Sequence, residues 1–226
     1  MASSPQLPLD LLSPIVSHIT DVPSLHFLCL VSHTFSHEAQ LRLYFDVALT
    51  GEAVLAFCRT VTASPHLSSL VRRLSLRIGP VFPYDAMDAL ATMDALATAL
   101  RSLTGLRALE LTGPQPRAWA PVAFCSAGLG LWPHRSSAWV LRGCPFRLRT
   151  FRTAHVLTCP DLCAFLAEQP EIEELVSVDL SCGTVVLPVD VLPALRSFRS
   201  VMTRLEFAGL ERAVPDGRLD IQVEGW

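Results

Sequence analysis

Lysine and asparagine are both absent from this chain of 226 residues, so its 18 residues of the Lys and Arg class are all arginines. Without lysine there is no ε-amino group for Schiff-base chemistry, and a phosphate-binding loop that depends on lysine is excluded. The sequence also lacks the Gly-x-Ser-x-Gly and Gly-x-Gly-x-x-Gly turns of hydrolases and dinucleotide-binding folds. The formal net charge of −3 argues against binding of nucleic acid through bulk positive charge. We therefore expect no catalytic residue, no cofactor and no nucleic-acid partner.

Signals for secretion, membrane insertion and disulfide formation are missing as well. The first ten residues have neither a basic start nor a long apolar run, unlike a secretory signal. The longest stretch without an acidic residue or an arginine, 118–134, is too short and too rich in proline and glycine to span a bilayer, which needs about 20 apolar residues. The seven cysteines are odd in number and show no tight paired spacing. We expect a soluble intracellular protein of the cytoplasm or nucleus, with free thiols and no membrane partner.

Hydrophobic residues, in contrast, make up half of the chain, and a helical pattern opens it. Leu7-Pro8 starts the first predicted helix, where the missing N–H of proline does no harm. Apolar residues then follow at helical spacing and fall on one face: Leu11, Leu12, Ile15, Val16 and Ile19. Pro14 lies inside this pattern. Either the first turn is loose, or the regular helix begins with Ser13 as cap and Pro14 in the first position.

The second predicted helix restarts at Asp21 and is apolar nearly all the way round. Only a narrow stripe of histidines interrupts the apolar residues: His26, His33 and His37. A helix that is apolar on every side must be buried on every side. The first helix and a third helix near 38–47 can cover part of it. The remaining side, together with the Leu7-Pro8 corner, predicts an outside partner.

Residues 5–47 resemble the F-box family. The match runs over two helices and a turn: Leu7, Pro8, Leu11, Leu12, Ile15, Ile19, Leu25, Leu28, Val31, Ser32 and Phe35. Phe35 stands where the family most often has tryptophan, and Pro14 is a second departure. The resemblance implies that these residues, apart from Ser32, dock a Skp-type adaptor protein of a cullin ubiquitin ligase. The alternative is an ordinary three-helix cap that buries its apolar faces on the rest of the chain.

After residue 48 short alternating runs recur, each suited to a strand buried on one side. They are Leu70-x3-Leu74-x-Leu76, Leu103-x2-Leu106-x2-Leu109-x-Leu111, Leu175-x2-Val178-x-Leu180 and Leu192-x2-Leu195-x2-Phe198. Helices are predicted at 52–61, 85–100 and 161–168, and a last strand carries Leu219, Ile221 and Val223. Repeated alternation of strand and helix indicates a solenoid and resembles leucine-rich repeats. The spacing is uneven, and the asparagine that those repeats usually carry after the strand is missing.

The predicted organisation is therefore α/β with two domains. Residues 1–48 form a three-helix F-box-like domain, and residues 49–226 form an irregular leucine-rich-repeat-like α/β solenoid. A compact α/β domain with leucine-rich strands remains the alternative for the second part. The segment 113–145 fits neither pattern, carries three of the four tryptophans, and is treated as a loop or insert of unknown structure.

Other clusters give alternative sites. Cys29, His33 and His37 are spaced four apart and could clamp a metal ion from one helix, with His26 on the same stripe. Cys159 and Cys163 form a second, weaker pair, for which His155 is the nearest base. Arg142, Arg147, Arg149 and Arg152 form the one basic concentration. Of these, Arg147 and Arg149 alternate with Phe146 and Leu148, which would place the arginines on the exposed side of a strand, available to an acidic partner.

The resemblance implies a function by proximity. The chain would be a substrate receptor that docks a Skp-type adaptor, and a cullin through it, at the F-box while the repeat region holds an unknown protein substrate. Tethering raises the effective concentration of the substrate at a separate enzyme, and the chain itself catalyses nothing. The alternatives are a scaffold outside any ubiquitin ligase and, further off, a metal-binding protein or an enzyme that uses cysteine and histidine. Metal ligands and substrate-binding residues are not assigned.

Overall fold

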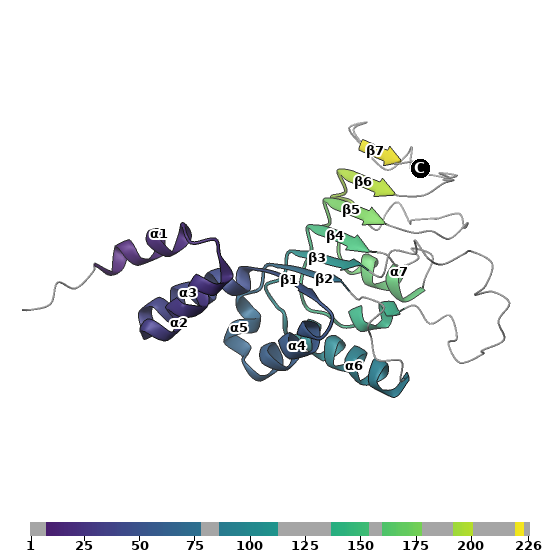
Figure 1. Cartoon of the computed structure of the whole chain (residues 1–226). Helices are drawn as coiled ribbons and strands as arrows, with labels where there is room; N and C mark the ends of the chain where they lie inside the picture. Colours follow the sequence, from purple (N-terminus) through teal and green to yellow (C-terminus); the bar gives the residue numbers. More distant parts are fainter. Residues whose placement is uncertain are drawn as a thin grey trace, which may run out of the picture.

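The computed structural model describes residues 8–77, 86–112, 137–153, 160–177, 192–200 and 220–223. Over these ranges the chain is an α/β protein built on one parallel sheet, as its alternating pattern predicts. The strands are β1 (Asp46–Thr50), β2 (Arg73–Arg77), β3 (Ala108–Thr112), β4 (Thr150–Thr153), β5 (Glu174–Ser177), β6 (Ser197–Ser200) and β7 (Asp220–Val223). Each strand pairs in parallel with the strand before it in the chain, so that the order in the sheet is β1 to β7 (Figure 1).

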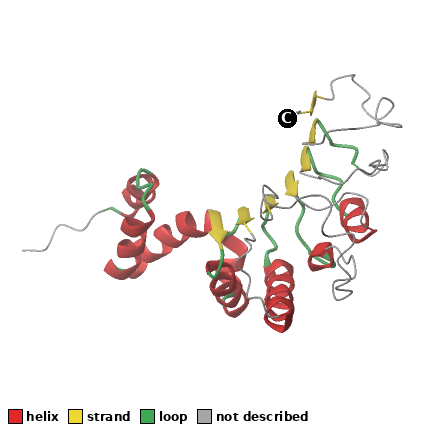
Figure 2. Ribbon diagram, turned by 45° about the vertical axis from the view of Figure 1, so that its right-hand side comes forward, coloured by secondary structure: helices red, strands yellow, loops and turns green. Residues whose placement is uncertain are grey.

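The helices that connect the strands lie on one side of the sheet (Figures 1 and 2). They are α4 (Ala53–Ala63), α5 (Pro65–Leu70), α6 (Ala86–Ser102), the 3₁₀ helix η2 (Ser137–Leu141) and α7 (Pro160–Ala167). The predicted helices at 52–61, 85–100 and 161–168 are thus confirmed to within two residues. Among the described residues, no helix combines the length and the apolar character needed to cross a bilayer.

The register stacks one apolar residue of every strand into a continuous row. Its members, from β1 to β7, are Val47, Leu74, Leu109, Phe151, Leu175, Phe198 and Ile221. The first six are buried beneath the covering helices. Because side chains alternate along a strand, the intervening residues face the opposite side of the sheet. Burial of the row and its neighbouring helix residues is the main favourable term for this part of the chain.

The number of residues between consecutive members of this row varies over the first four strands and is nearly constant over the last four. Consecutive members lie 27, 35, 42, 24, 23 and 23 residues apart along the chain. Leucine-rich repeats have periods of about 20–29 residues. The two long intervals contain 78–85 and 113–136, which lie outside the described residues, and the first of them also carries the long helix α6.

The predicted run Leu175-x2-Val178-x-Leu180 begins in β5, where Leu175 pairs with Phe151, whereas Val178 and Leu180 lie outside the described residues. Two predicted boundaries differ from the structure. The third helix was predicted to reach Val47, whereas Asp46–Thr50 is the edge strand β1. Finally, β4 begins only at Thr150, although the predicted alternation of buried Phe146 and Leu148 with exposed arginines is confirmed.

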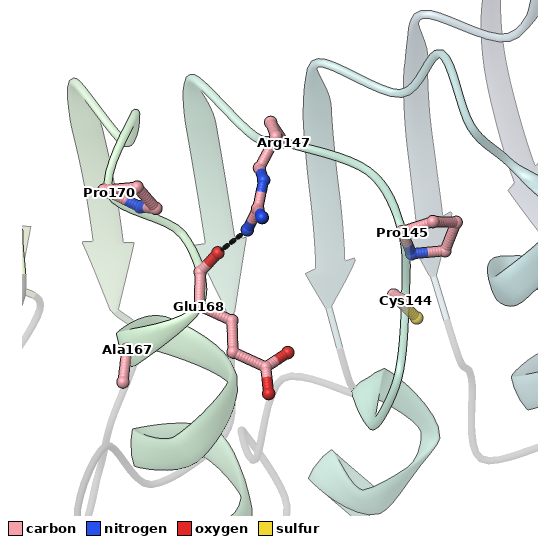
Figure 3. A pocket seen from close by; sticks show the side chains of 6 residues that line it. All are labelled: Cys144, Pro145, Arg147, Ala167, Glu168 and Pro170. Atoms are coloured by element: carbon pink, nitrogen blue, oxygen red, sulfur yellow. Dashed lines mark hydrogen bonds between the residues drawn. The ribbon is translucent and has the colours of Figure 1, made fainter.

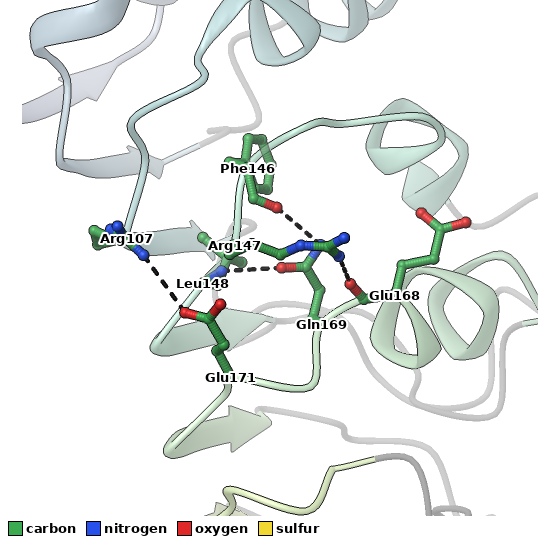
Figure 4. Close-up of polar contacts among 7 residues, drawn as sticks. All are labelled: Arg107, Phe146, Arg147, Leu148, Glu168, Gln169 and Glu171. Carbon is green, nitrogen blue, oxygen red and sulfur yellow. Dashed lines mark hydrogen bonds and ion pairs between the residues drawn. The ribbon is translucent and has the colours of Figure 1, made fainter.

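Gln169 joins the segment after α7 to the segment before β4 through buried hydrogen bonds (Figure 4). Its side chain is fully buried after the end of α7. The Nε2 atom donates to the carbonyl of Phe146 at 3.2 Å, and Oε1 accepts from the N–H of Leu148 at 2.9 Å. The amide therefore satisfies both kinds of backbone group on the segment that enters β4.

Replacing Gln169 by leucine is expected to lower the free energy of unfolding by about 2–3 kcal/mol, because a buried N–H and a buried carbonyl lose their partner. The same substitution at the partly buried Gln40, whose side chain bonds only Ser36 Oγ at 3.4 Å, should change it by less than about 0.5 kcal/mol. Urea unfolding of both variants measures the difference. Equal stabilities would contradict the role given to Gln169.

Candidate docking surface of the N-terminal helices

The first helix has a loose start. A 3₁₀ turn, η1 (Leu9–Leu11), precedes α1 (Leu12–Ser17), and the N–H of Leu11 donates to the carbonyl of Pro8 at 3.1 Å. Pro14 is the third residue of α1, where a backbone N–H has no partner within an α-helix. Of the two arrangements that the sequence left open, the structure has the loose first turn.

The second helix, α2 (Val22–Val31), has a well-formed N-terminus. The carboxylate of Asp21 accepts from the N–H of Ser24 at 2.9 Å, and Pro23 occupies the second helical position. The hydrogen bond from Ser24 holds the pKa of Asp21 below its ordinary value. The restart of the helix at Asp21 is thus confirmed, and its physical cause is a capping carboxylate.

Helix α2 ends at Val31, whereas the sequence pattern predicted a second helix that continues to Phe35. Ser32 has an extended backbone, with φ −161° and ψ 162°, and its Oγ accepts from the N–H of Phe35 at 3.3 Å. It therefore caps a new helix, α3 (His33–Phe45), in place of the helix predicted near 38–47.

Because of this break, the predicted histidine stripe is split between two helices. His26 and Cys29 lie on α2, whereas His33 and His37 lie on α3, so one helix does not present the four together. Nowhere in the described ranges do three His, Cys, Asp or Glu side chains come close enough to hold a metal ion. Cys159 and His155 lie outside those ranges.

A small core holds the three helices together. It consists of Val16, Leu25 and Ala39, with Ile19, Leu28, Cys29, Phe35 and Leu43 packed against it. Both α1 and α2 pack on α3. Nη2 of Arg42 on α3 also donates to the carbonyl of Ser17, the last residue of α1, at 3.0 Å. These contacts decide which apolar side chains point inward.

Large apolar side chains are left exposed at the end of η1 and on the other sides of α1 and α2. Their exposed fractions are 49% for Leu11, 44% for Ile15, 64% for Val22, 70% for Phe27, 79% for Leu30 and 65% for Val31. We call these six residues the outward apolar surface. On α2, at about 100° per residue, Phe27, Leu30 and Val31 lie on the side away from Leu25, whereas Val22 in the first turn lies only about 60° from Leu25. The one other large hydrophobic side chain that is exposed in the described chain is Phe45.

The predicted adaptor-binding residues divide between this surface and the core. Pro8, Leu11, Ile15 and Val31 are exposed. Leu12 and Leu25 are buried, and Ile19, Leu28 and Phe35 are partly buried against the small core. Leu7 lies outside the described residues. The sequence prediction missed Val22, Phe27 and Leu30, although the all-round apolar pattern of the second helix signalled that some of its residues must stay outside.

The face of the sheet opposite the helices carries mostly polar side chains. Asp46 pairs with Arg73 at 3.7 Å, and Glu110 pairs with Arg152 at 3.9 Å while it accepts from Ser75 Oγ at 3.2 Å. These residues belong to neighbouring strands and are partly or largely exposed. The face therefore offers charged groups of both signs, held on a rigid sheet.

Two shallow depressions open between the turn after η2 and α7, and Glu168 lines both. One has a volume of about 320 Å³ and is lined by Cys144, Pro145, Arg147, Ala167, Glu168 and Pro170 (Figure 3). The other, of about 390 Å³, includes Arg142 and Asp161, which form an ion pair. Burial raises the pKa of the Cys144 thiol to about 12, against the nearby Arg101, which lowers it. The thiol is thus protonated at neutral pH and is a poor nucleophile.

No protein-family model matches the chain, and no curated protein matches it.

The core and the outward surface should respond differently to truncation. Leu25→Ala is expected to lower the free energy of unfolding of the N-terminal helices by about 2–5 kcal/mol, because it leaves a cavity. Leu30→Ala should change it by less than about 0.5 kcal/mol, because the side chain is already in water. Hydrogen exchange of the α2 and α3 amides measures both. A large effect of Leu30→Ala would contradict the outward placement.

The buried thiols should make stability depend on pH at the alkaline side. Burial raises the pKa of Cys58 from 9.0 to about 11 and that of Cys144 from 9.0 to about 12. Between pH 9 and 11 the unfolded chain therefore releases protons that the folded chain retains, and stability falls as pH rises. Urea unfolding of the double variant Cys58→Ala, Cys144→Ala should show a weaker fall over this range. An unchanged slope would contradict the prediction.

Proposed function

We propose that this chain is the substrate receptor of a cullin-type ubiquitin ligase, and that the outward apolar surface docks a Skp-type adaptor. The observation that carries the proposal is the concentration of exposed apolar side chains on η1, α1 and α2, where six of the seven in the described residues lie. They coincide with the segment whose sequence resembles an F-box. In this proposal α1, α2 and α3 together form the F-box-like domain of residues 1–48.

An outside partner explains this surface better than the cap alternative does. A cap would turn these side chains toward the rest of the chain, yet Phe27 and Leu30 are among the most exposed large hydrophobics. Phe27 lies three and four residues before Leu30 and Val31 on α2, so these exposed side chains are neighbours on the helix surface, and apolar patches of this kind mark interaction sites. Aromatic and large aliphatic side chains also supply most of the energy at the centre of interfaces, which favours Phe27 and Leu30 as the main contacts.

The second half of the proposal assigns the substrate to the sheet. We infer that residues 49–226 form an irregular leucine-rich-repeat-like solenoid, with the insert near 113–145. Support comes from the strand order, in which each strand pairs with its chain neighbours, and from the last three repeat lengths of 24, 23 and 23 residues. The polar open face, with Arg73, Glu110 and Arg152, is the natural place for a protein substrate.

The chain catalyses nothing in this proposal and acts by holding two proteins near each other. The high pKa of the Cys58 and Cys144 thiols supports a structural role for both. In the same proposal the chain needs no cofactor, and it contacts neither nucleic acid nor membrane.

The double variant Phe27→Asp, Leu30→Asp tests the docking. Wild-type chain co-expressed with a Skp-type adaptor should co-elute with it from a size-exclusion column, as expected for an interface of about 800 Å² per partner. The double variant should not co-elute, because two carboxylates would have to be buried without partners.

The control is Thr34→Asp, an exposed change near the N-terminus of α3 that a helix tolerates. It should leave the complex intact, and circular dichroism should show all three proteins folded. Loss of the complex in the control, or its survival in the double variant, would contradict the assigned surface. Adding a cullin then separates a ligase subunit, which recruits it, from a scaffold, which does not.

A further inference from the structure

A row of charged residues marks the edge of the sheet where the strands begin. Its members, in order across the sheet, are Arg72, Arg107, Arg149, Glu173 and Arg196. The backbone N–H of each member donates to the carbonyl of the member before it, at N···O distances of 2.8, 2.7, 2.8 and 2.8 Å. Neighbouring positions of the row are therefore one strand spacing, about 4.8 Å, apart. Four of its five members are arginines.

The arginines of this row differ in how they are paired. Arg72 donates to the carbonyl of Ser69 at 2.6 Å. Arg107 reaches Glu171 at 3.5 Å (Figure 4), and Arg196 lies 3.9 Å from Glu173. Arg149 is exposed and has no ion pair or side-chain hydrogen bond with any described residue.

Arg147 adds a second guanidinium beside that of Arg149. The segment 145–149 alternates exposed and buried residues, with Phe146 and Leu148 fully buried, so Arg147 and Arg149 point out on the same side. The segment is irregular backbone before β4, with a bend at Arg149, and Cα atoms two residues apart lie at most about 7 Å from each other. Arg147 donates one N–H to the carbonyl of Glu168, as Figures 3 and 4 show, and keeps other donors for a ligand.

Like charges at neighbouring positions of the row repel one another, and Glu171 and Glu173 offset part of this repulsion. The pair formed by Arg107 and Arg149 is partly offset by Glu171, but Arg147 and Arg149 have no carboxylate partner among the described residues. An arginine presents a planar fork of donors that matches a carboxylate.

We propose that Arg147 and Arg149 form a docking site for an extended protein segment that carries acidic residues at alternate positions. In such a segment every second side chain points to the same side with a spacing of about 6.8 Å, which is within reach of two arginine side chains whose Cα atoms lie at most about 7 Å apart. One carboxylate then meets each guanidinium, and Arg107 lies one strand spacing further along the edge.

The carboxylates in this edge favour a peptide over a nucleic acid. Glu171 and Glu173 lie close to Arg149, so a strand with one charge at every phosphate would meet repulsion there. A peptide with only two or three acidic side chains avoids them. The site does not depend on adaptor docking, because its residues belong to the sheet edge and not to α1 or α2.

Fluorescence anisotropy with labelled peptides tests the site on the full chain. The probe is a ten-residue serine peptide with glutamate at two alternate positions in its centre, and its counterpart has glutamine at the same two positions. The acidic peptide should bind at 50 mM salt, weaken as salt is raised, and bind at least about tenfold more tightly than the glutamine peptide. Arg149→Gln should weaken binding about fivefold, and Arg147→Gln with Arg149→Gln more than tenfold.

Arg59→Gln is the matched control, because Arg59 is an exposed arginine on α4, far from this edge, and has no hydrogen bond or ion pair among the described residues. It should bind the acidic peptide as the wild type does. The reversed variant Arg149→Glu should lose the acidic peptide while its circular dichroism stays unchanged. Failure of the wild type to bind, equal weakening by Arg59→Gln, or tighter binding of an oligonucleotide than of the acidic peptide would overturn the proposal.

Discussion

Parallel pairing of each strand with its chain neighbour is the constraint on which the rest of this structure depends. It forces every connection to cross from the end of one strand to the start of the next, which needs a dozen or more residues. In the connections between β1 and β5, as far as the structure describes them, those residues form helices that cover one side of the sheet. The row from Val47 to Phe198 is buried beneath them, while the opposite face of the sheet keeps its charged side chains. One pairing rule thus produces both the core and the polar face.

The N-terminal helices obey a different constraint. Their shared core is small, and the second helix is apolar on most of its circumference, so folding leaves part of it in water. Helices this short gain most of their stability from packing, and a partner that covers Phe27 and Leu30 would extend that packing. We regard the outward apolar surface as the feature of the molecule that most needs a functional explanation.

Strong hydrophobic periodicity made most of the helices predictable from the sequence. Local hydrogen bonds and strand pairing decided the helix break at Ser32 and the strand registers. The helices at 52–61, 85–100 and 161–168 have the pattern of one buried face, and they were found. The run Leu175-x2-Val178-x-Leu180 begins within the strand Glu174–Ser177, and the register of that strand follows from the pairing of Leu175 with Phe151, which the sequence alone does not give. The break at Ser32 was missed because one serine hydroxyl outweighs an apolar pattern that continues through it. Which members of an all-round apolar helix face outward depends on where α3 packs, and a helical wheel does not contain that information.

The most direct measurement is hydrogen–deuterium exchange, followed by mass spectrometry, of the chain alone and with a Skp-type adaptor. The central claim is that the outer sides of α1 and α2 become covered. It predicts slower exchange in peptides from 11–31 when the adaptor is present, with unchanged exchange in β2 to β5. Equal exchange in 11–31 under saturating adaptor, or protection confined to the sheet, would contradict it.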